Sequence, residues 1–201
     1  MGRIGVDRPE NKSLLSELRK QPGMMGLRLN INQHKASVAE GKTDWLWPEA
    51  ERTRTPLMLS VTTDLFPEVA KIAAKYPGLR LAIDHLAMVR GKKDAAASVN
   101  LPHVLALAKW PNVSAKCSAL PSYSSESYPY PGLHETIRRV YDAFGPERMF
   151  WGTDLTRLPC TYRQAITLFT EELPWLTTAD LEWIMGRSLC GWLGWAMPAK
   201  V

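Results

Sequence analysis

Segments of strand character and segments of helical character alternate along most of this 201-residue chain. The strand-like segments are short and apolar, and the segments between them carry apolar residues at helical spacing. We expect strands over residues 24–31, 57–61, 80–85, 112–118 and 148–154. We expect helices over residues 12–20, 44–54, 64–76, 101–109, 133–144, 162–170 and 178–189. Strands that alternate with helices through short connections predict βαβ units and therefore a parallel α/β sheet.

Two architectures fit this order of elements, an open doubly wound sheet and a (β/α)8 barrel. The strands lack a clean alternation of apolar and polar residues, which is typical of a sheet with both faces covered. No GxGxxG or GxxxxGKS/T motif follows any strand, and this weakens the nucleotide-binding form of the open sheet.

Polar residues collect at the carboxyl ends of successive strands. They are Arg28 and Asn30, Ser60 and Thr62, Asp84 and His85, Lys116 and Ser118, and Thr153 and Asp154. In both parallel architectures this edge of the sheet carries the active site. We therefore expect a site for a small-molecule substrate there.

The composition is that of one globular domain over residues 1–201, with 45% hydrophobic and 22% charged residues. No segment approaches the roughly 18 apolar residues of a membrane span, and residues 1–13 lack the apolar core of a signal peptide. The net charge of +5 comes from scattered residues without interleaved aromatic residues, which argues against a nucleic-acid groove. We expect a cytoplasmic protein with no membrane and no nucleic-acid partner.

The three cysteines are odd in number and widely spaced. Cys117, Cys160 and Cys190 form neither a CxxC pair nor a Cys/His cluster with zinc spacing. We expect all three thiols to be free and to serve as small buried hydrophobic residues.

Three stretches resemble the amidohydrolase-related family of metal-dependent-hydrolase-like TIM barrels, which includes lactonases and nonoxidative decarboxylases. RLAIDHLA is similar to the sixth strand of that family, NVSAKCSAL to its seventh and RMFWGTDLTR to its eighth. PGMMGLRLN resembles the fourth strand, and IMGRSLCGWLGW resembles the closing helix. The resemblance covers nearly the whole chain in the right order, and it implies a fold of the (β/α)8 TIM-barrel type.

The resemblance also implies that the barrel is incomplete. By this alignment the chain begins near the third strand, at GRIGVD, so the first two or three βα units of a barrel of about 250 residues are missing. We expect an open sheet of five or six parallel strands with outer helices. Its unpaired edges would favour self-association, unless the final helices, rich in tryptophan, fold back over the gap.

The metal ligands of the family are largely absent. The family opens with an HxH pair on its first strand and carries another histidine on its fifth, whereas this chain has no HxH and reads LMLSVTT at the fifth strand. A divalent metal such as zinc belongs to the complete family fold, but we expect no metal ligand set and no cofactor in this chain. Three further histidines, His34, His103 and His134, are expected to be solvated.

His85 and Asp154 are the predicted catalytic residues. A lone histidine after a strand is often a core residue, and an aspartate after Gly-Thr is often an ordinary helix cap. The resemblance instead makes His85 an inward-facing group that polarises a substrate carbonyl, and it makes Asp154 the carboxylate that activates water. Because side chains alternate along a strand, we expect Asp84 to point away from His85, into the helical layer.

Four further residues are predicted to bind substrate. Arg28 and Arg157 can clamp a carboxylate through paired hydrogen bonds, although the partner of Arg28 is either a substrate or a protein acid. Tyr128 and Tyr130 lie, with Tyr123, in a loop long enough to cover a pocket, and the alternative is a plain surface loop. Lys116 is expected to be a surface lysine.

The leading hypothesis is a hydrolase of the amidohydrolase-related family that acts on a small carboxylated or cyclic ester, lactone-like substrate. The alternatives are a nonoxidative decarboxylase on the same scaffold, or an incomplete barrel with no activity of its own.

Overall fold

The computed structural model describes residues 1–197, and its centre is a parallel sheet of five strands in the order β1-β2-β3-β4-β5. The strands are β1 Leu27–Asn30, β2 Leu57–Ser60, β3 Leu81–Ile83, β4 Val113–Ser118 and β5 Met149–Gly152. Their register places Leu57 beside both Leu27 and Leu81, and it pairs Ala115 with Met149. The predicted α/β fold with a parallel sheet is confirmed.

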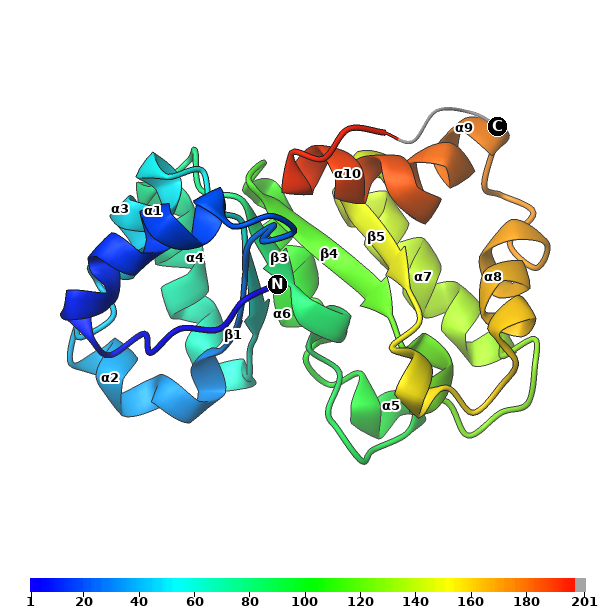
Figure 1. Ribbon diagram of the computed structural model, residues 1–201. Coiled ribbons are helices and arrows are strands. Elements are labelled where there is room, and N and C mark those ends of the chain that lie inside the picture. The colour runs from blue at the N-terminus through cyan, green and yellow to red at the C-terminus, as the bar shows by residue number, and fades with distance from the viewer. Residues whose placement is uncertain (198–201) are drawn as a thin grey trace.

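Helices connect the strands (Figure 1). They are α1 Lys12–Lys20, α2 Lys35–Ala39, α3 Leu46–Arg52, α4 Phe66–Lys75, α5 Asp94–Ala97, α6 Leu101–Ala106, α7 Pro131–Phe144, α8 Tyr162–Thr170, α9 Thr178–Glu182 and α10 Ser188–Leu193. A π-helical turn over Trp183–Arg187 joins α9 to α10, so the single helix expected over residues 178–189 changes its hydrogen-bond pattern midway.

The segment GRIGVD contributes one bridge rather than a full sixth strand. Gly2 forms a parallel bridge with Leu27, and its carbonyl accepts the backbone N–H of Arg28 at 2.9 Å. Within residues 1–197 no strand pairs with the far edge of β5, so the sheet is open rather than closed into a barrel. This agrees with the expected sheet of the incomplete TIM-barrel type.

The two faces of the sheet pack against different partners. The outer face carries Leu57, Leu59, Leu81, Ile83, Val113 and Ala115. These residues share one core with buried residues of α4, α6 and α7. The inner face carries Met58, Ala82 and Phe150, which form a separate cluster with Trp192 and Leu193 of α10.

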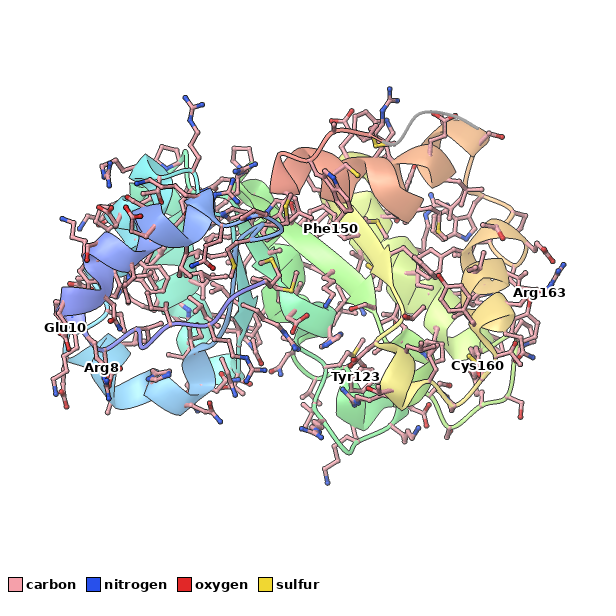
Figure 2. The ribbon with its side chains drawn as sticks, viewed as in Figure 1. Arg8, Glu10, Tyr123, Phe150, Cys160 and Arg163 are labelled. Carbon is pink, nitrogen blue, oxygen red and sulfur yellow. The ribbon has the colours of Figure 1, made fainter. Side chains whose placement is uncertain are left out.

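Helix α10 covers the starting end of the inner face. Its Trp192 ring lies 5.6 Å from the ring of Phe150, and only 6% of Trp192 is exposed. Figure 1 shows α10 at the starting end of β4 and β5, and Figure 2 shows Phe150 beneath it. Trp195 is 59% exposed, because the helix ends at Leu193 and Gly194 turns the chain away.

Each strand is followed directly or within three residues by a short 3-10 turn. These turns span Ile31–His34, Thr63–Leu65, Asp84–Ala87, Leu120–Tyr123 and Leu155–Arg157. Because the strands are parallel, all five turns lie along the same edge of the sheet, opposite to α10. Helix α10 therefore leaves the carboxyl edge of the sheet uncovered, and a site can form there.

Replacing Trp192 by alanine should lower the free energy of unfolding by about 3 kcal/mol, because it leaves a cavity above Phe150 and uncovers the inner face. Urea unfolding measures the stability, and light scattering measures the self-association that should accompany it. Trp195→Ala is the matched control, and it should change stability by less than about 0.5 kcal/mol. Equal effects of the two substitutions would contradict the covering role of α10.

Candidate active site

A cavity of about 710 Å³ opens at the carboxyl edge of the sheet. Arg28, Asp84, His85, Asp154 and Arg157 all line it, so it contains four of the residues that the sequence predicted for the site. They come from β1, from the turn after β3 and from the turn after β5. Residues separated by more than a hundred positions in sequence therefore meet because the sheet is parallel.

Asp84 lies at the base of the cavity between two cations. Its side chain is 1% exposed, and it accepts hydrogen bonds from Arg28 Nε at 2.7 Å and from Lys116 Nζ at 2.8 Å. Burial opposes ionisation of this carboxyl, but Lys116, His85 and Arg28 outweigh burial and hold the pKa of Asp84 below its usual value. The partner of Arg28, which the sequence left open, is thus a protein acid.

Two expectations about these residues were wrong. Lys116 is largely buried and not a surface lysine, because its position in β4 directs it to the inner face with Ser114 and Ser118. Asp84 does not point into the helical layer away from His85, since both line the cavity and His85 Nε2 lies 3.5 Å from Asp84 Oδ1. The strand ends at Ile83, so strand alternation no longer applies to either residue.

A left-handed turn presents His85 to the cavity. His85, Leu86 and Ala87 have φ values of 50°, 51° and 51°, a region that costs non-glycine residues about 1–2 kcal/mol each. The turn is held by the buried Asn100, whose Nδ2 donates to the carbonyl of Ala87 at 2.9 Å, and by the burial of Leu86. The surrounding structure thus imposes the conformation of a predicted catalytic residue.

The imidazole of His85 contacts side chains from three different strands or strand ends. Nδ1 lies 2.7 Å from Ser118 Oγ, and Nε2 lies 3.3 Å from Arg28 Nη2 and 3.5 Å from Asp154 Oδ2. Burial lowers the pKa of His85, and Lys116 and Arg28 lower it further, which outweighs the opposite effect of Asp84 and Asp154. His85 is therefore neutral at neutral pH.

Asp154 and Arg157 form the other wall of the cavity. Asp154 follows β5 in a left-handed conformation, is 30% exposed at its side chain and lies 3.5 Å from Arg157 Nη1. Arg157 also donates to the hydroxyl of Tyr123 at 3.2 Å and stacks over its ring. Figure 2 shows Tyr123 beside the turn that follows β5.

The structure does not bring Tyr128 and Tyr130 to the cavity. The hydroxyl of Tyr128 donates to Glu172 at 2.6 Å and lies 2.9 Å from the hydroxyl of Thr167 in α8, so the loop is attached to α8 and the residues that follow it. Tyr130 is buried in the core, where burial raises its pKa to about 12. The tyrosine that lines the cavity is Tyr123. Tyr123 belongs to the same loop and ends the 3-10 turn Leu120–Tyr123 that follows β4.

Several polar residues of the cavity were missed or set aside at the level of sequence. His34, expected to be solvated, is half-buried in the cavity wall. His103 is exposed, as expected, with its ring stacked on Phe66, and His134 is half-buried against the carbonyl of Pro129. The sequence did not predict a role for Asn100. An asparagine at the start of a helix is usually a helix cap, and no local pattern shows that its side chain binds the distant carbonyl of Ala87 instead.

The residues of this cavity do not by themselves fit a divalent metal. Within residues 1–197 no three His, Cys, Asp or Glu side chains converge as metal ligands would. Asp84 is already bonded to two cations, and the Arg28 guanidinium lies 3.3 Å from His85 Nε2, where it would repel a metal ion. Of the side chains that meet at Asp84, this leaves His85 and Asp154, which are half of a tetrahedral zinc site.

The remaining expectations concern cysteines and membranes. Cys117, Cys160 and Cys190 are free, and burial raises the pKa of the Cys117 thiol. Among the described helices, none is long and apolar enough to span a bilayer.

Comparison with known proteins identifies relatives of this chain. A family model described as amidohydrolase matches residues 1–187. An L-fucono-1,5-lactonase from Burkholderia ambifaria is 36% identical over 99 residues, which are 47% of this chain and 32% of the lactonase. The match therefore spans about a third of the length of that enzyme.

Solved structures share the fold. An amidohydrolase from Burkholderia multivorans with bound zinc has a TM-score of 0.77 at 17% identity, over 96% of this chain and 72% of its own. A probable 2-pyrone-4,6-dicarboxylic acid hydrolase from Acinetobacter baumannii with citric acid bound has a TM-score of 0.71 at 15% identity, over 97% of this chain and 72% of its own. A 5-carboxyvanillate decarboxylase from Sphingomonas paucimobilis has a TM-score of 0.68 at 11% identity, over 98% of this chain and 66% of its own.

Replacing His85 by glutamine should remove one component of the pH dependence of stability. Because the pKa of His85 is lowered on folding, the unfolded chain binds more protons between that pKa and the ordinary value of 6.5. The contribution is complete above pH 6.5 and is lost as pH falls through the folded pKa. Urea unfolding from pH 5 to pH 8 should show that wild type minus His85→Gln stability rises with pH and then levels off. A difference that falls with rising pH would mean that the two aspartates raise this pKa instead.

Proposed function

This chain belongs to the amidohydrolase family, whose model matches residues 1–187, and we propose that it hydrolyses small lactones. The observation that carries the proposal is the convergence of Asp154, His85 and Arg28 in one cavity at the carboxyl edge of the sheet. Such a cavity holds a carboxylate able to accept a proton, beside cations able to stabilise an oxyanion.

The surroundings of the two aspartates favour Asp154 as the general base. Asp84 is 1% exposed and already accepts three hydrogen bonds from Arg28 and Lys116. Asp154 is 30% exposed, and its nearest cation, Arg157, lies at 3.5 Å. A water molecule can therefore reach Asp154 but not Asp84.

The proposed reaction adds water across the acyl C–O bond of the lactone. Asp154 takes a proton from water while the water oxygen bonds to the carbonyl carbon, and the carbonyl electrons move onto oxygen. The ring C–O bond then breaks, and protonated Asp154 returns the proton to the leaving alkoxide. The product is one open hydroxy acid.

The opposite wall of the cavity suits the hydroxyl groups of a sugar lactone. Asn32 donates to Ser60 at 3.4 Å and accepts from Thr62 at 3.0 Å, and all three line the cavity. The curated relative is an L-fucono-1,5-lactonase, so L-fucono-1,5-lactone is the first substrate to test, followed by lactones that carry a carboxylate. A pH-indicator assay on the purified chain should show acid release with the intact cavity.

Decarboxylation is the second candidate, since Arg28 and Arg157 could hold an aromatic acid and a decarboxylase shares the fold. Carbon dioxide release from aromatic acids, with no acid release from lactones, would favour it. No turnover on either panel would favour the third hypothesis, a chain without activity of its own.

Replacing Asp154 by asparagine should lower kcat for lactone hydrolysis about 10²- to 10⁴-fold, because the amide cannot accept the proton of water. Steady-state kinetics on an accepted lactone measure the loss. Asp142→Asn is the control, since Asp142 is exposed on α7 and paired with Arg138. An Asp154→Asn enzyme that keeps its kcat would exclude this residue as the base.

Replacing Arg157 by methionine should raise KM about tenfold or more for a lactone that bears a carboxylate, because a charge-assisted hydrogen bond is lost. For an uncharged lactone, KM should change less than about twofold. Arg163→Met on the exposed side of α8, where Figure 2 shows Arg163 directed outward, is the matched control. Equal changes in KM for both lactones would show that Arg157 does not bind the substrate carboxylate.

A further inference from the structure

The hydrogen-bond partners of His85 are fixed in role on both sides of the ring. Nδ1 lies 3.3 Å from the carbonyl oxygen of Ser118 and 2.7 Å from its hydroxyl. A carbonyl oxygen only accepts hydrogen bonds, so Nδ1 must carry a proton to face it favourably. The hydroxyl can act as a donor or as an acceptor and is compatible with that proton.

On the other side, Nε2 lies 3.3 Å from Nη2 of Arg28. A guanidinium only donates hydrogen bonds, so Nε2 must offer its lone pair. A proton on Nε2 would face this cation. Among residues 1–197 its carboxylate neighbours are Asp84 and Asp154, both 3.5 Å away, beyond good hydrogen-bond distance.

We infer that His85 is held as the Nδ1–H tautomer, with Ser118 as its positioning residue, and that Arg28 therefore polarises the substrate carbonyl in its place. The sequence-based role of His85 as carbonyl-polarising group requires an Nε2–H donor toward the cavity. In the Nδ1–H form that donor is absent. Burial, which lowers the pKa of His85, supports the neutral ring.

Arg28 is built for the role that His85 cannot fill. Its Nε and Nη2 are fixed by Asp84, and Nη2 also faces His85. Nη1 has no hydrogen-bond partner among residues 1–197, while 42% of the side chain is exposed. Arg28 would donate from Nη1 to the oxyanion without losing a proton, and the proton of water would still pass to Asp154. This second half of the inference rests on the proposed lactonase function; the tautomer does not.

The tautomer can be measured without a substrate. Long-range ¹H–¹⁵N correlation spectra of ¹⁵N-histidine-labelled chain at about pH 8, above the ordinary histidine pKa, report which ring nitrogen is protonated in each of the four histidines. The His85→Gln spectrum assigns His85. His134 is the internal reference, because its Nε2 lies 3.0 Å from the carbonyl of Pro129 and must be the protonated nitrogen there.

The expected result is a protonated Nδ1 and an unprotonated Nε2 in His85, opposite to His134. Protonation of His85 at Nε2, alone or together with Nδ1, overturns the inference. If exchange broadens the nitrogen signals, the ¹³Cδ2 shift of ¹³C-histidine-labelled chain gives the same answer.

Ser118→Ala separates the hydroxyl of Ser118 from its carbonyl. The carbonyl that faces Nδ1 is kept, so Nδ1–H should remain the main tautomer of His85. Ser114→Ala, on the same strand and face, is the matched control and should leave the ratio unchanged. A change to Nε2–H as the main tautomer in Ser118→Ala would overturn the assignment of the tautomer to the carbonyl.

Kinetics test the role of Arg28. If the chain hydrolyses lactones, Arg28→Lys should lower kcat about 10²- to 10³-fold, the effect of removing an oxyanion donor, with little change in KM. Lysine keeps a positive charge beside Asp84. An unchanged kcat would overturn the assignment of Arg28, whereas a chain inactive on all lactones with His85 in the Nδ1–H form would refute the proposed function and leave the tautomer standing.

Discussion

The buried carboxylate of Asp84 is the interaction on which the rest of the site depends. It accepts hydrogen bonds from Arg28 of β1 and Lys116 of β4, so it joins two strands that are not neighbours in the sheet. Two cations on the inner face would repel each other without a shared anion, and a lone buried carboxylate would lose its hydration. The three charges are therefore stable only together. Their geometry then orients the guanidinium that faces His85 and the cavity.

The strained turn after β3 is likewise stable only because its neighbours hold it. Three left-handed residues in succession cost several kcal/mol in total, on the order of 1–2 each, and they persist because buried neighbours fix them. Asn100 holds the carbonyl of Ala87, and Ser118 holds the ring of His85. Asn100 in turn accepts a hydrogen bond from Thr63, which follows β2. The turns after β2 and β3 and the last residue of β4 are thus coupled beside the cavity.

The inner face of the sheet divides into an apolar end and a polar end. At the starting end Phe150 packs beneath Trp192 of α10, and at the carboxyl end Lys116 and Asp84 carry charge. Positions two residues apart along a strand lie on the same face, so one strand can serve both ends. Met58 and Ser60 of β2 show this division directly, because Met58 lies in the apolar cluster and Ser60 lines the cavity.

The sequence by itself determined the order of strands and helices, the parallel sheet and the edge that carries the site, because hydrophobic periodicity and strand-end polarity are local properties. It also identified His85, Asp154, Arg28 and Arg157 as residues of that edge. Only the tertiary structure decided that Asp84 and Lys116 face inward, because a left-handed turn and a distant charge partner leave no local signal. It likewise decided that Tyr123 rather than Tyr128 reaches the cavity, since the course of a long loop depends on contacts with residues far away in the sequence, such as that of Tyr128 with Glu172.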